Sequence, residues 1–339
     1  MSNIETKSDP IPHGIGSKPT LFSIPTERWV TGFRDGVRKG WSGFVWLLQM
    51  LIPISFLTAL LQYSGWLHRL DTLIAPMMGW IGLPGAAALP IIVGMLTGVY
   101  GGIAAMILLP FSPHQMTLIA IFVLISHNLI QESVIQARSG FTAIKATVFR
   151  ILASLITVAA VSRWMRTETG PSLSFDAGAF QSQSVPLTHY LVDWALSMGQ
   201  LSIKIFFIVM GLMVILGLLK SFDWIPALVR ILRPFLRLMG LNERVGVLWL
   251  TAVVFGLTYG AAVIVEEAKE GNLSARDLEK LHLSVGINHS MVEDPILFVA
   301  LGLNAFWLYV PRLVTAMVAV RLWEIWMQIK GGYRDARVG

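Results

Sequence analysis

The chain carries one polar segment twice, as SHNLIQES at residues 126–133 and as NHSMVEDP at residues 288–295. Each copy places a histidine, a small polar residue and a pair of acidic or amide side chains inside a long apolar run. In water such a run would form a buried helix with a polar seam, whereas in a bilayer it would span the membrane. Ionisable side chains are costly at membrane depth and are usually retained there for a function. The composition of the remaining chain decides between these two settings.

The composition is that of a membrane protein. Hydrophobic residues make up 55% of the 339 residues and charged residues only 14%, whereas soluble domains carry about a quarter charged residues. The sequence therefore predicts an all-α integral membrane protein. The net charge of +6 comes from Lys and Arg scattered at the ends of apolar runs, a pattern typical of membrane topology rather than of nucleic-acid binding. The chain has no cysteine, which excludes disulfides and thiolate chemistry. It also lacks a Walker loop, a dinucleotide-binding fingerprint and an HExxH motif, so we expect no enzymatic activity.

The apolar runs predict the number of membrane spans. A span needs about 20 mainly apolar residues, and we expect about eight, at residues 41–63, 84–109, 115–136, 141–164, 191–219, 245–265, 281–303 and 306–327. Two shorter segments, 66–83 and 222–241, contain proline and charged residues and predict interfacial or re-entrant helices. Residues 27–40 are polar and basic and predict a separate interfacial helix. Ser112, followed three residues later by Gln115, predicts a capped start for the span that follows.

The two halves of the chain match at regular spacings. One constant offset relates the glycines of the two halves, and after a short insertion a slightly larger offset relates the polar positions. The matched pairs are Gly98 with Gly256, Gly102 with Gly260, Ser112 with Ser274 and His127 with His289. We therefore expect two homologous multi-span repeats, at residues 41–165 and 190–328, joined by a linker at 166–189 and flanked by tails at 1–40 and 329–339. Repeats with broken segments at equivalent positions indicate a transporter with its site at the repeat interface. Whether the two repeats are parallel or inverted stays open at this point.

The duplicated segment supplies the candidate site. His289 and Glu293 are four residues apart and lie on one helix face, and Pro295 is expected to break the helix near that point. The alternative interpretation is a buried polar network without a ligand, and the duplication favours the functional one. The candidate substrate- or ion-binding residues are His127, Asn128, Gln131, Glu132, Asn288, His289, Ser290, Glu293 and Asp294. Imidazole and carboxylate groups also suit a divalent metal, and the metal-ligand candidates are His127, Glu132, His289 and Glu293.

Glycines and hydroxyl side chains in the preceding spans form a second candidate set. Small residues spaced four apart let helices approach closely in lipid, so helix packing is the favoured interpretation and a cavity lining is the alternative. The residues concerned are Gly98, Tyr100, Gly102, Gly256, Thr258, Tyr259 and Gly260.

These motifs resemble the nucleoside-recognition, or Gate, domain family of bacterial inner-membrane proteins. The resemblance rests on GVYGG at residues 98–102 with the segment at 126–132, and on GLTYG at 256–260 with the segment at 288–295. The domain is shared with concentrative nucleoside transporters, the membrane part of ferrous-iron transporter B proteins and the spore maturation A and B proteins. The resemblance implies a gated-pore architecture. This chain has neither the nucleotide-binding domain nor the cysteines of the iron transporters, so the resemblance does not fix the substrate.

Together these features predict a multi-pass transporter of the bacterial inner membrane that moves a small polar, nucleoside-like solute coupled to protons or sodium. The alternatives are a divalent-cation transporter for iron, zinc or manganese, and a non-transporting membrane scaffold or regulator. The expected partners are the lipid bilayer and the solute or cation, with no nucleic acid, and assembly into a homo-oligomer stays open. No cofactor is expected apart from a cation held at the cluster. Basic residues near both ends of the chain favour a cytoplasmic N-terminus and C-terminus.

Overall fold

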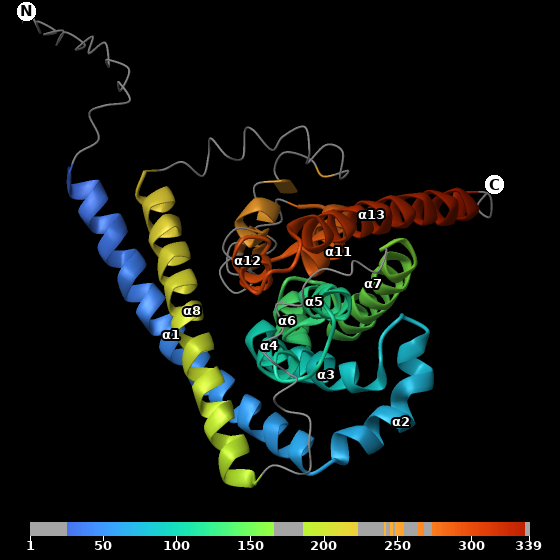
Figure 1. Cartoon of the computed structure of the whole chain (residues 1–339). Coiled ribbons are helices and arrows are strands. Elements are labelled where there is room, and N and C mark those ends of the chain that lie inside the picture. Colours follow the sequence, from blue (N-terminus) through green and yellow to red (C-terminus); the bar gives the residue numbers. More distant parts are fainter. Residues whose placement is uncertain are drawn as a thin grey trace, which may run out of the picture.

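The computed structural model describes residues 26–165, 186–222, 241, 245–246, 248–253, 264–267 and 273–335. Regular structure in these residues is helical, with no strand (Figure 1), which confirms the predicted all-α class. The helices of the first half are α1 (Thr26–Tyr63), α2 (Trp66–Gly79), η1 (Gly85–Ala87), α3 (Ala88–Thr97), α4 (Val99–Met106), α5 (Pro113–Ser126), α6 (Leu129–Arg138) and α7 (Ala143–Trp164). Those of the second half are α8 (Leu187–Ser221), α11 (Ala275–Asn288), α12 (Glu293–Ala300) and α13 (Ala305–Asp335).

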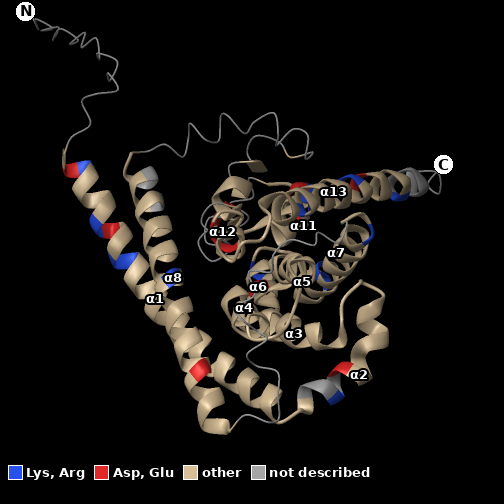
Figure 2. Ribbon diagram, in the orientation of Figure 1, with Lys and Arg blue, Asp and Glu red and all other residues tan. Residues whose placement is uncertain are grey.

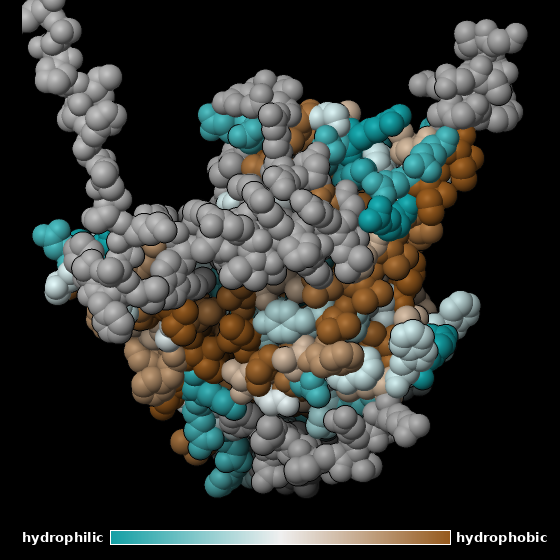
Figure 3. Space-filling view, turned by 90° about the horizontal axis from the view of Figure 1, so that it is seen from above, coloured by the Kyte–Doolittle hydropathy of each residue, from teal (hydrophilic) through white to brown (hydrophobic). Residues whose placement is uncertain are grey.

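Five stretches of the described chain are long and apolar enough to cross a membrane, at Thr26–Tyr63, Pro113–Arg138, Ala143–Trp164, Leu187–Ile215 and Ala305–Lys330. Their outward faces carry large hydrophobic side chains, which cover broad parts of the described surface in Figure 3. Water would not tolerate so much exposed apolar area, but lipid covers it at no cost. About half of the predicted span at 245–265, nearly all of the short segment at 222–241 and most of the predicted linker lie outside the described residues.

The interfacial helix predicted for residues 27–40 is wrong as a separate element. Those residues continue without interruption into the first span as α1. The reason is a close pairing of α1 with α8, which lie side by side in Figure 1. A Cβ added at Gly36 would lie 2.6 Å from the Cα of Val214, so only glycine permits this approach. The start of α1 lies against the end of α8, because Ser221 donates a hydrogen bond to the carbonyl of Arg28.

The span predicted for residues 84–109 is also wrong, because α3 and α4 are two short helices that fold back on each other. The chain reverses at Gly98, whose φ of 100° is in the region that favours glycine. A Cβ added at Gly94 would lie 3.4 Å from the Cα of Gly102, which shows how closely the two arms pack. Hydropathy averages over such a reversal, so the apolar run looked like a single crossing.

The two spans that carry the duplicated segment are broken helices. Ser112 caps α5 through the predicted capping box with Gln115. The helix stops at His127, whose backbone is extended, and restarts as α6 after Asn128 at φ 45°. In the second half α11 stops at His289 in the same way, Ser290 has φ 50°, and α12 begins at Glu293. The break thus precedes Pro295, which occupies the first turn of α12, where its missing N–H costs no hydrogen bond.

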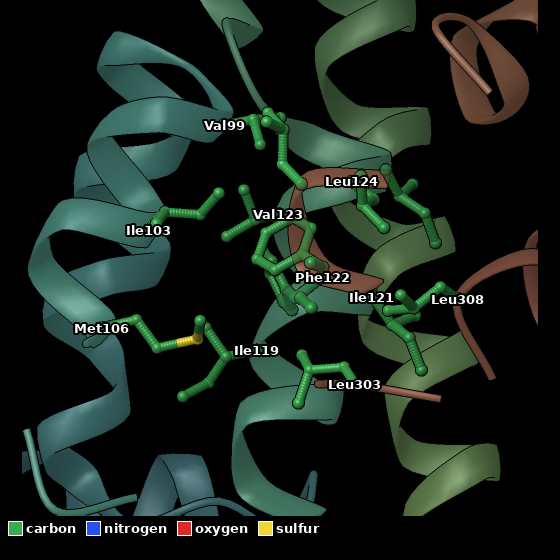
Figure 4. Close-up of a cluster of buried hydrophobic side chains, with 14 of the residues drawn as sticks. Val99, Ile103, Met106, Ile119, Ile121, Phe122, Val123, Leu124, Leu303 and Leu308 are labelled. Atoms are coloured by element: carbon green, nitrogen blue, oxygen red, sulfur yellow. The ribbon is translucent and has the colours of Figure 1, made fainter. Parts of the chain in front are cut away.

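The core around these breaks is built mainly from α5. Ten consecutive residues of this helix, Thr117–Ser126, are buried, and α4, α7 and α13 pack against it. Figure 4 shows Ile119, Phe122 and Val123 of α5 among side chains of α4, with Leu303 and Leu308 nearby. A helix that is apolar on all sides belongs in the centre of a bundle. Helix α5 therefore keeps the break at His127 inside the helix bundle.

Candidate functional site

The two helix breaks meet, and their histidines touch. The Nε2 atoms of His127 and His289 are 3.1 Å apart, and both side chains are buried. The Nδ1 atom of His127 faces the carbonyl of Val123 at 3.2 Å, and that of His289 faces the carbonyl of Val285 at 2.9 Å. The two segments predicted to converge therefore do so at their histidines.

The contacts of the two imidazole rings determine how many protons the pair holds. A carbonyl oxygen only accepts hydrogen bonds, so each Nδ1 carries a hydrogen. For the contact between the two Nε2 atoms to be a hydrogen bond, one of them must carry a second hydrogen. A hydrogen bond between the two rings would thus make one an imidazole and the other an imidazolium, with one proton between them.

Two buried carboxylates accompany the histidine pair. Glu132 bridges it, with Oε1 3.3 Å from Nε2 of His127 and Oε2 2.9 Å from Nε2 of His289. Asp294 lies on the other side, with Oδ2 3.2 Å from Nε2 of His127. Most charged residues lie toward helix ends, as on the upper half of α1 in Figure 2, whereas these groups lie inside the helix bundle. A proton held by the histidine pair would therefore have two carboxyl groups as neighbours.

Two arginines that the sequence analysis did not single out complete the cluster. Arg150 of α7 donates from Nε to the carbonyl of Ile125 at 2.8 Å and from a terminal nitrogen to that of His127 at 2.7 Å. Its other terminal nitrogen lies 2.7 Å from Oε2 of Glu132. The guanidinium thus satisfies carbonyls that the helix break leaves free, and neutralises a buried carboxylate.

Arg312 of α13 does the same for the other break. It donates to the carbonyl of Ile287 at 2.8 Å and to that of His289 at 3.2 Å, and also reaches the carbonyl of Leu124 at 3.1 Å. Both arginines are fully buried. Arg150 and Arg312 are separated by the same offset as the two histidines, and so are the residues whose carbonyls they bind within each break. Each lies within an apolar run, and their matching positions at the repeat offset were the signal in the sequence that could have identified them.

The backbone at each break is anchored by the preceding segment. The amide of Asn128 donates to the carbonyl of Gly94 at 3.3 Å, and the amide of Ser290 donates to that of Ala252 at 3.3 Å. A Cβ added at Gly98 would lie 3.0 Å from the side-chain amide of Asn128, so Gly98 supports the break by close packing. Gly102 packs against Gly94 in the same hairpin.

The remaining predicted residues are not all part of the cluster. Glu293 instead accepts a hydrogen bond of 2.9 Å from the hydroxyl of Tyr100, and Gln131 is exposed. Asn288 is fully buried, and neither atom of its amide has a hydrogen-bond partner among the described residues. Ser290 is half-buried at the break. The candidates that lie outside the described residues are Gly256, Thr258, Tyr259 and Gly260.

Three of the residues could together hold a metal ion. The ligand atoms of His127, Glu132 and His289 lie within 4.8 Å of one another. Glu293, the fourth metal-ligand candidate, is bonded to Tyr100 instead, because it points about 100° around the helix from Asp294. Arg150 already occupies Oε2 of Glu132, and a guanidinium next to a divalent cation is electrostatically unfavourable.

A narrow cavity lies on the Tyr100 side of the cluster. Its wall is apolar apart from Tyr100 and Lys204, and comes from α1, α4, α8 and α12 with the residue that follows α12. Because Tyr100 bonds Glu293, the residue beside Asp294, this cavity borders the cluster. In this conformation it has room for no more than about one water molecule.

Residues 44–161 match the family described as "Gate: Nucleoside recognition". The chain is 30% identical over 311 residues, which cover 88% of this chain and 96% of the relative, to a protein of Bacillus subtilis (strain 168) described as the uncharacterized membrane protein YvoD. No solved structure matches the chain. With its apolar helices and its two helix breaks joined by buried histidines, the chain belongs to the nucleoside-recognition (Gate) domain family and is a membrane protein.

Proposed function

We propose that this membrane protein is a transporter that moves a small polar solute across the bilayer, coupled to a proton held by His127 and His289. The observation that carries the proposal is the 3.1 Å contact between the two Nε2 atoms where the breaks meet. Buried ionisable groups that pair inside a membrane bundle are typical of proton relays in transporters. Histidine is also the side chain whose charge changes most readily near neutral pH.

The charges of the cluster favour a proton as the coupling ion. Arg150 and Arg312 balance Glu132 and Asp294, so one added proton can be offset by the neighbouring Glu293. Sodium would need several oxygen ligands. The carbonyls freed by the breaks are already bound by the two arginines. The cluster therefore favours a proton over a sodium ion, the other coupling ion that the sequence left open.

We further propose that the halves are inverted repeats. This is supported by the contact of the start of α1 with the end of α8, since those helices occupy equivalent places in the two halves. In addition, α6 runs antiparallel to α11, because His289 lies near the start of α6 and His282 near its end. Inverted repeats meeting at broken helices support alternating access around a central site.

The proposed orientation places both termini in the cytoplasm of a bacterial cell. Basic residues gather at the helix ends that would face that side, in accordance with the positive-inside rule. They are Arg28, Arg34, Arg38, Lys39, Arg138, Lys145, Arg276, Lys280, Arg321 and Lys330.

The solute would bind beside the cluster through Asn288. An amide offers both donors and an acceptor, and buried amides are normally hydrogen-bonded. The amide of Asn288 has no partner among the described residues and lies directly before the histidine of the break. A nucleoside base edge or a ribose hydroxyl has the complementary groups. We therefore propose a nucleoside-like solute.

The test is transport by the purified protein in liposomes that contain a pH-sensitive dye. Addition of a transported nucleoside should change the internal pH, and His289→Ala should abolish this change. His189→Ala is the matched control, since His189 is exposed on α8 and should transport normally. Uptake of solute with no proton movement would contradict the coupling, and no movement of any solute by the folded protein would support the scaffold alternative.

Divalent-cation transport is the second candidate, because His127, Glu132 and His289 offer three converging ligands. If so, zinc or manganese should stabilise the folded protein by mass action, by about 2.7 kcal/mol at a hundredfold excess over Kd. This stabilisation is measured as a higher apparent melting temperature. The shift should be lost in His289→Ala. The proximity of Arg150 to Glu132 leads us to expect no such shift.

A further inference from the structure

A second group of buried polar side chains extends away from the cluster between α6 and α11. Glu132 and Gln136 are four residues apart on α6 and therefore lie on one face. Gln136 is 1% exposed, and neither atom of its amide has a hydrogen-bond partner within the described chain. A Cβ added at Gly286 of α11 would lie 3.4 Å from Nε2 of Gln136, so that glycine leaves room beside the amide.

His282 continues this group toward the surface. Its Nε2 lies 3.0 Å from the hydroxyl of Ser139, and Phe141 stacks on the ring with centroids 5.4 Å apart. The other ring nitrogen, Nδ1, is buried and has no partner in the part of the chain that the structure describes. An imidazole can accept a proton at one nitrogen and release one from the other. Nδ1 of His282 is therefore available to take up or release a proton inside the protein.

Charged residues stand at the outer end. Glu279 lies one helical turn before His282 on α11 and pairs with Lys145 at 3.7 Å, with side-chain exposures of 31% and 65%. Glu324 of α13, nearby through Lys280, also pairs with Arg321. The buried group thus connects the central cluster with a wetted, charged surface.

The corresponding positions on the other side of the cluster are apolar. The offset that relates His127 to His289 also pairs each of these polar side chains, and Ser284 of α11, with a hydrophobic side chain. The pairs are Gln136 with Phe298, Ser139 with Leu301, His282 with Ala120, and Ser284 with Phe122. Phe298 and Phe122 are buried in the main hydrophobic core, and Figure 4 shows Phe122 there. The polar group therefore has no counterpart on the opposite side.

We propose that Gln136, Ser139 and His282 form a one-sided route by which water and protons pass between the surface around Glu279 and the His127–His289 pair. The route rests on the proposed proton coupling and adds the side from which the proton is exchanged, which is the side of Lys145 and Glu279. Water fits the unpartnered amide and ring nitrogen, since buried polar groups without protein partners are normally hydrated. The apolar residues opposite exclude water in this conformation.

The test uses the natural absence of cysteine. Single cysteines are placed on the route, as Gln136→Cys or His282→Cys, and at the matched opposite positions, as Phe298→Cys or Ala120→Cys. Membrane vesicles are exposed to silver ions in chloride-free buffer, because a silver ion is comparable in size to a water molecule and binds thiols. Thiols that remain are then counted by maleimide labelling of the denatured protein. Lys145→Cys at the surface and Ile156→Cys on an exposed apolar position of α7 set the fast and slow limits.

We expect the route cysteines to react at least tenfold faster than their matched partners, and only from the side on which Lys145→Cys reacts. Equal rates within the pairs, whether fast or slow, would overturn the proposal. Two pairs are used so that a variant that fails to fold does not decide the result. This outcome is independent of transport. Reactive route cysteines without proton-coupled transport would refute the proposed function but support the route. Proton-coupled transport with unreactive route cysteines would support the function but refute the route.

Discussion

Arg150 and Arg312 each stabilise a helix break by donating hydrogen bonds to its carbonyls from a neighbouring helix. Each is fully buried and binds two carbonyls of the adjacent break, and Arg150 also pairs with Glu132. A planar guanidinium with several donors can make these contacts at once, whereas an ammonium group cannot. The charge of each arginine is therefore tied to the backbone geometry of the site.

Replacing one of these arginines should strongly destabilise the fold. Arg150→Leu removes the arginine partner of Glu132 and the donors to two backbone carbonyls. Breaking a buried ion pair in this way costs about 3–5 kcal/mol. Thermal or denaturant unfolding in detergent measures the loss. Arg163→Leu on the exposed end of α7 is the control and should change stability by less than about 1 kcal/mol. Equal effects of the two substitutions would show that Arg150 carries no special role.

Replacing Asn288, in contrast, should stabilise the fold. Because its buried amide has no partner among the described residues, Asn288→Leu should raise stability by about 1 kcal/mol while it lowers solute affinity. The matched position in the first half is Ser126, whose hydroxyl donates to the carbonyl of Phe122 at 2.8 Å. Ser126→Ala should therefore lose stability. Unfolding and solute binding are measured on the same preparations, and a loss of both stability and affinity in Asn288→Leu would indicate a structural role for Asn288.

At the scale of the helices, the decisive features are the reversal at Gly98 and the two breaks. The cap at Ser112 was predictable because the motif is local and its two hydrogen bonds lie within one turn. The reversal at Gly98 was not, since the surrounding run is uniformly apolar and only the backbone angle distinguishes it. Similarly, nothing near Tyr100 in the sequence indicates that it bonds Glu293, which lies in the other half of the chain.

Gly98 should not tolerate a side chain. Its φ of 100° disfavours any L-residue, and a Cβ would lie 3.0 Å from the amide of Asn128. We expect Gly98→Ala to cost more than about 1 kcal/mol and to reduce transport, because the hairpin supports the break at His127. Gly199→Ala is the control, since it has open space within α8 and should be neutral or stabilise by about 0.5–1 kcal/mol. Normal stability of Gly98→Ala would contradict the described reversal.

At the scale of the whole molecule, α1 and α8 pair so that the start of α1 lies against the end of α8. The helical class, the membrane setting and the pairing of the two histidine segments were all predictable from composition and spacing. The continuous course of α1 was not, because Gly32, Gly36 and Gly40 gain their meaning only from a partner helix in the other half of the chain.

This helix pair should be sensitive to small additions of volume. Gly36→Ala places a methyl group 2.6 Å from the Cα of Val214, and such overpacking typically costs about 1–3 kcal/mol. The nearby Gly43 has only one atom, at 4.0 Å, within reach of an added Cβ, so Gly43→Ala is the control and should be tolerated. Melting temperatures in detergent compare the two, and an unchanged value for Gly36→Ala would argue against the close approach.

The difference between Gln136 and Phe298 has a consequence for how such a protein could arise. In a dimer of two identical inverted subunits, any polar group that admits water from one side would recur on the other. Such a dimer would carry the same water route on both faces. A single fused chain is free of this constraint, because each half can diverge alone. A water route that opens to one side only is therefore a property that fusion of two halves makes available, and residues that break the match between the halves are the places to look for it.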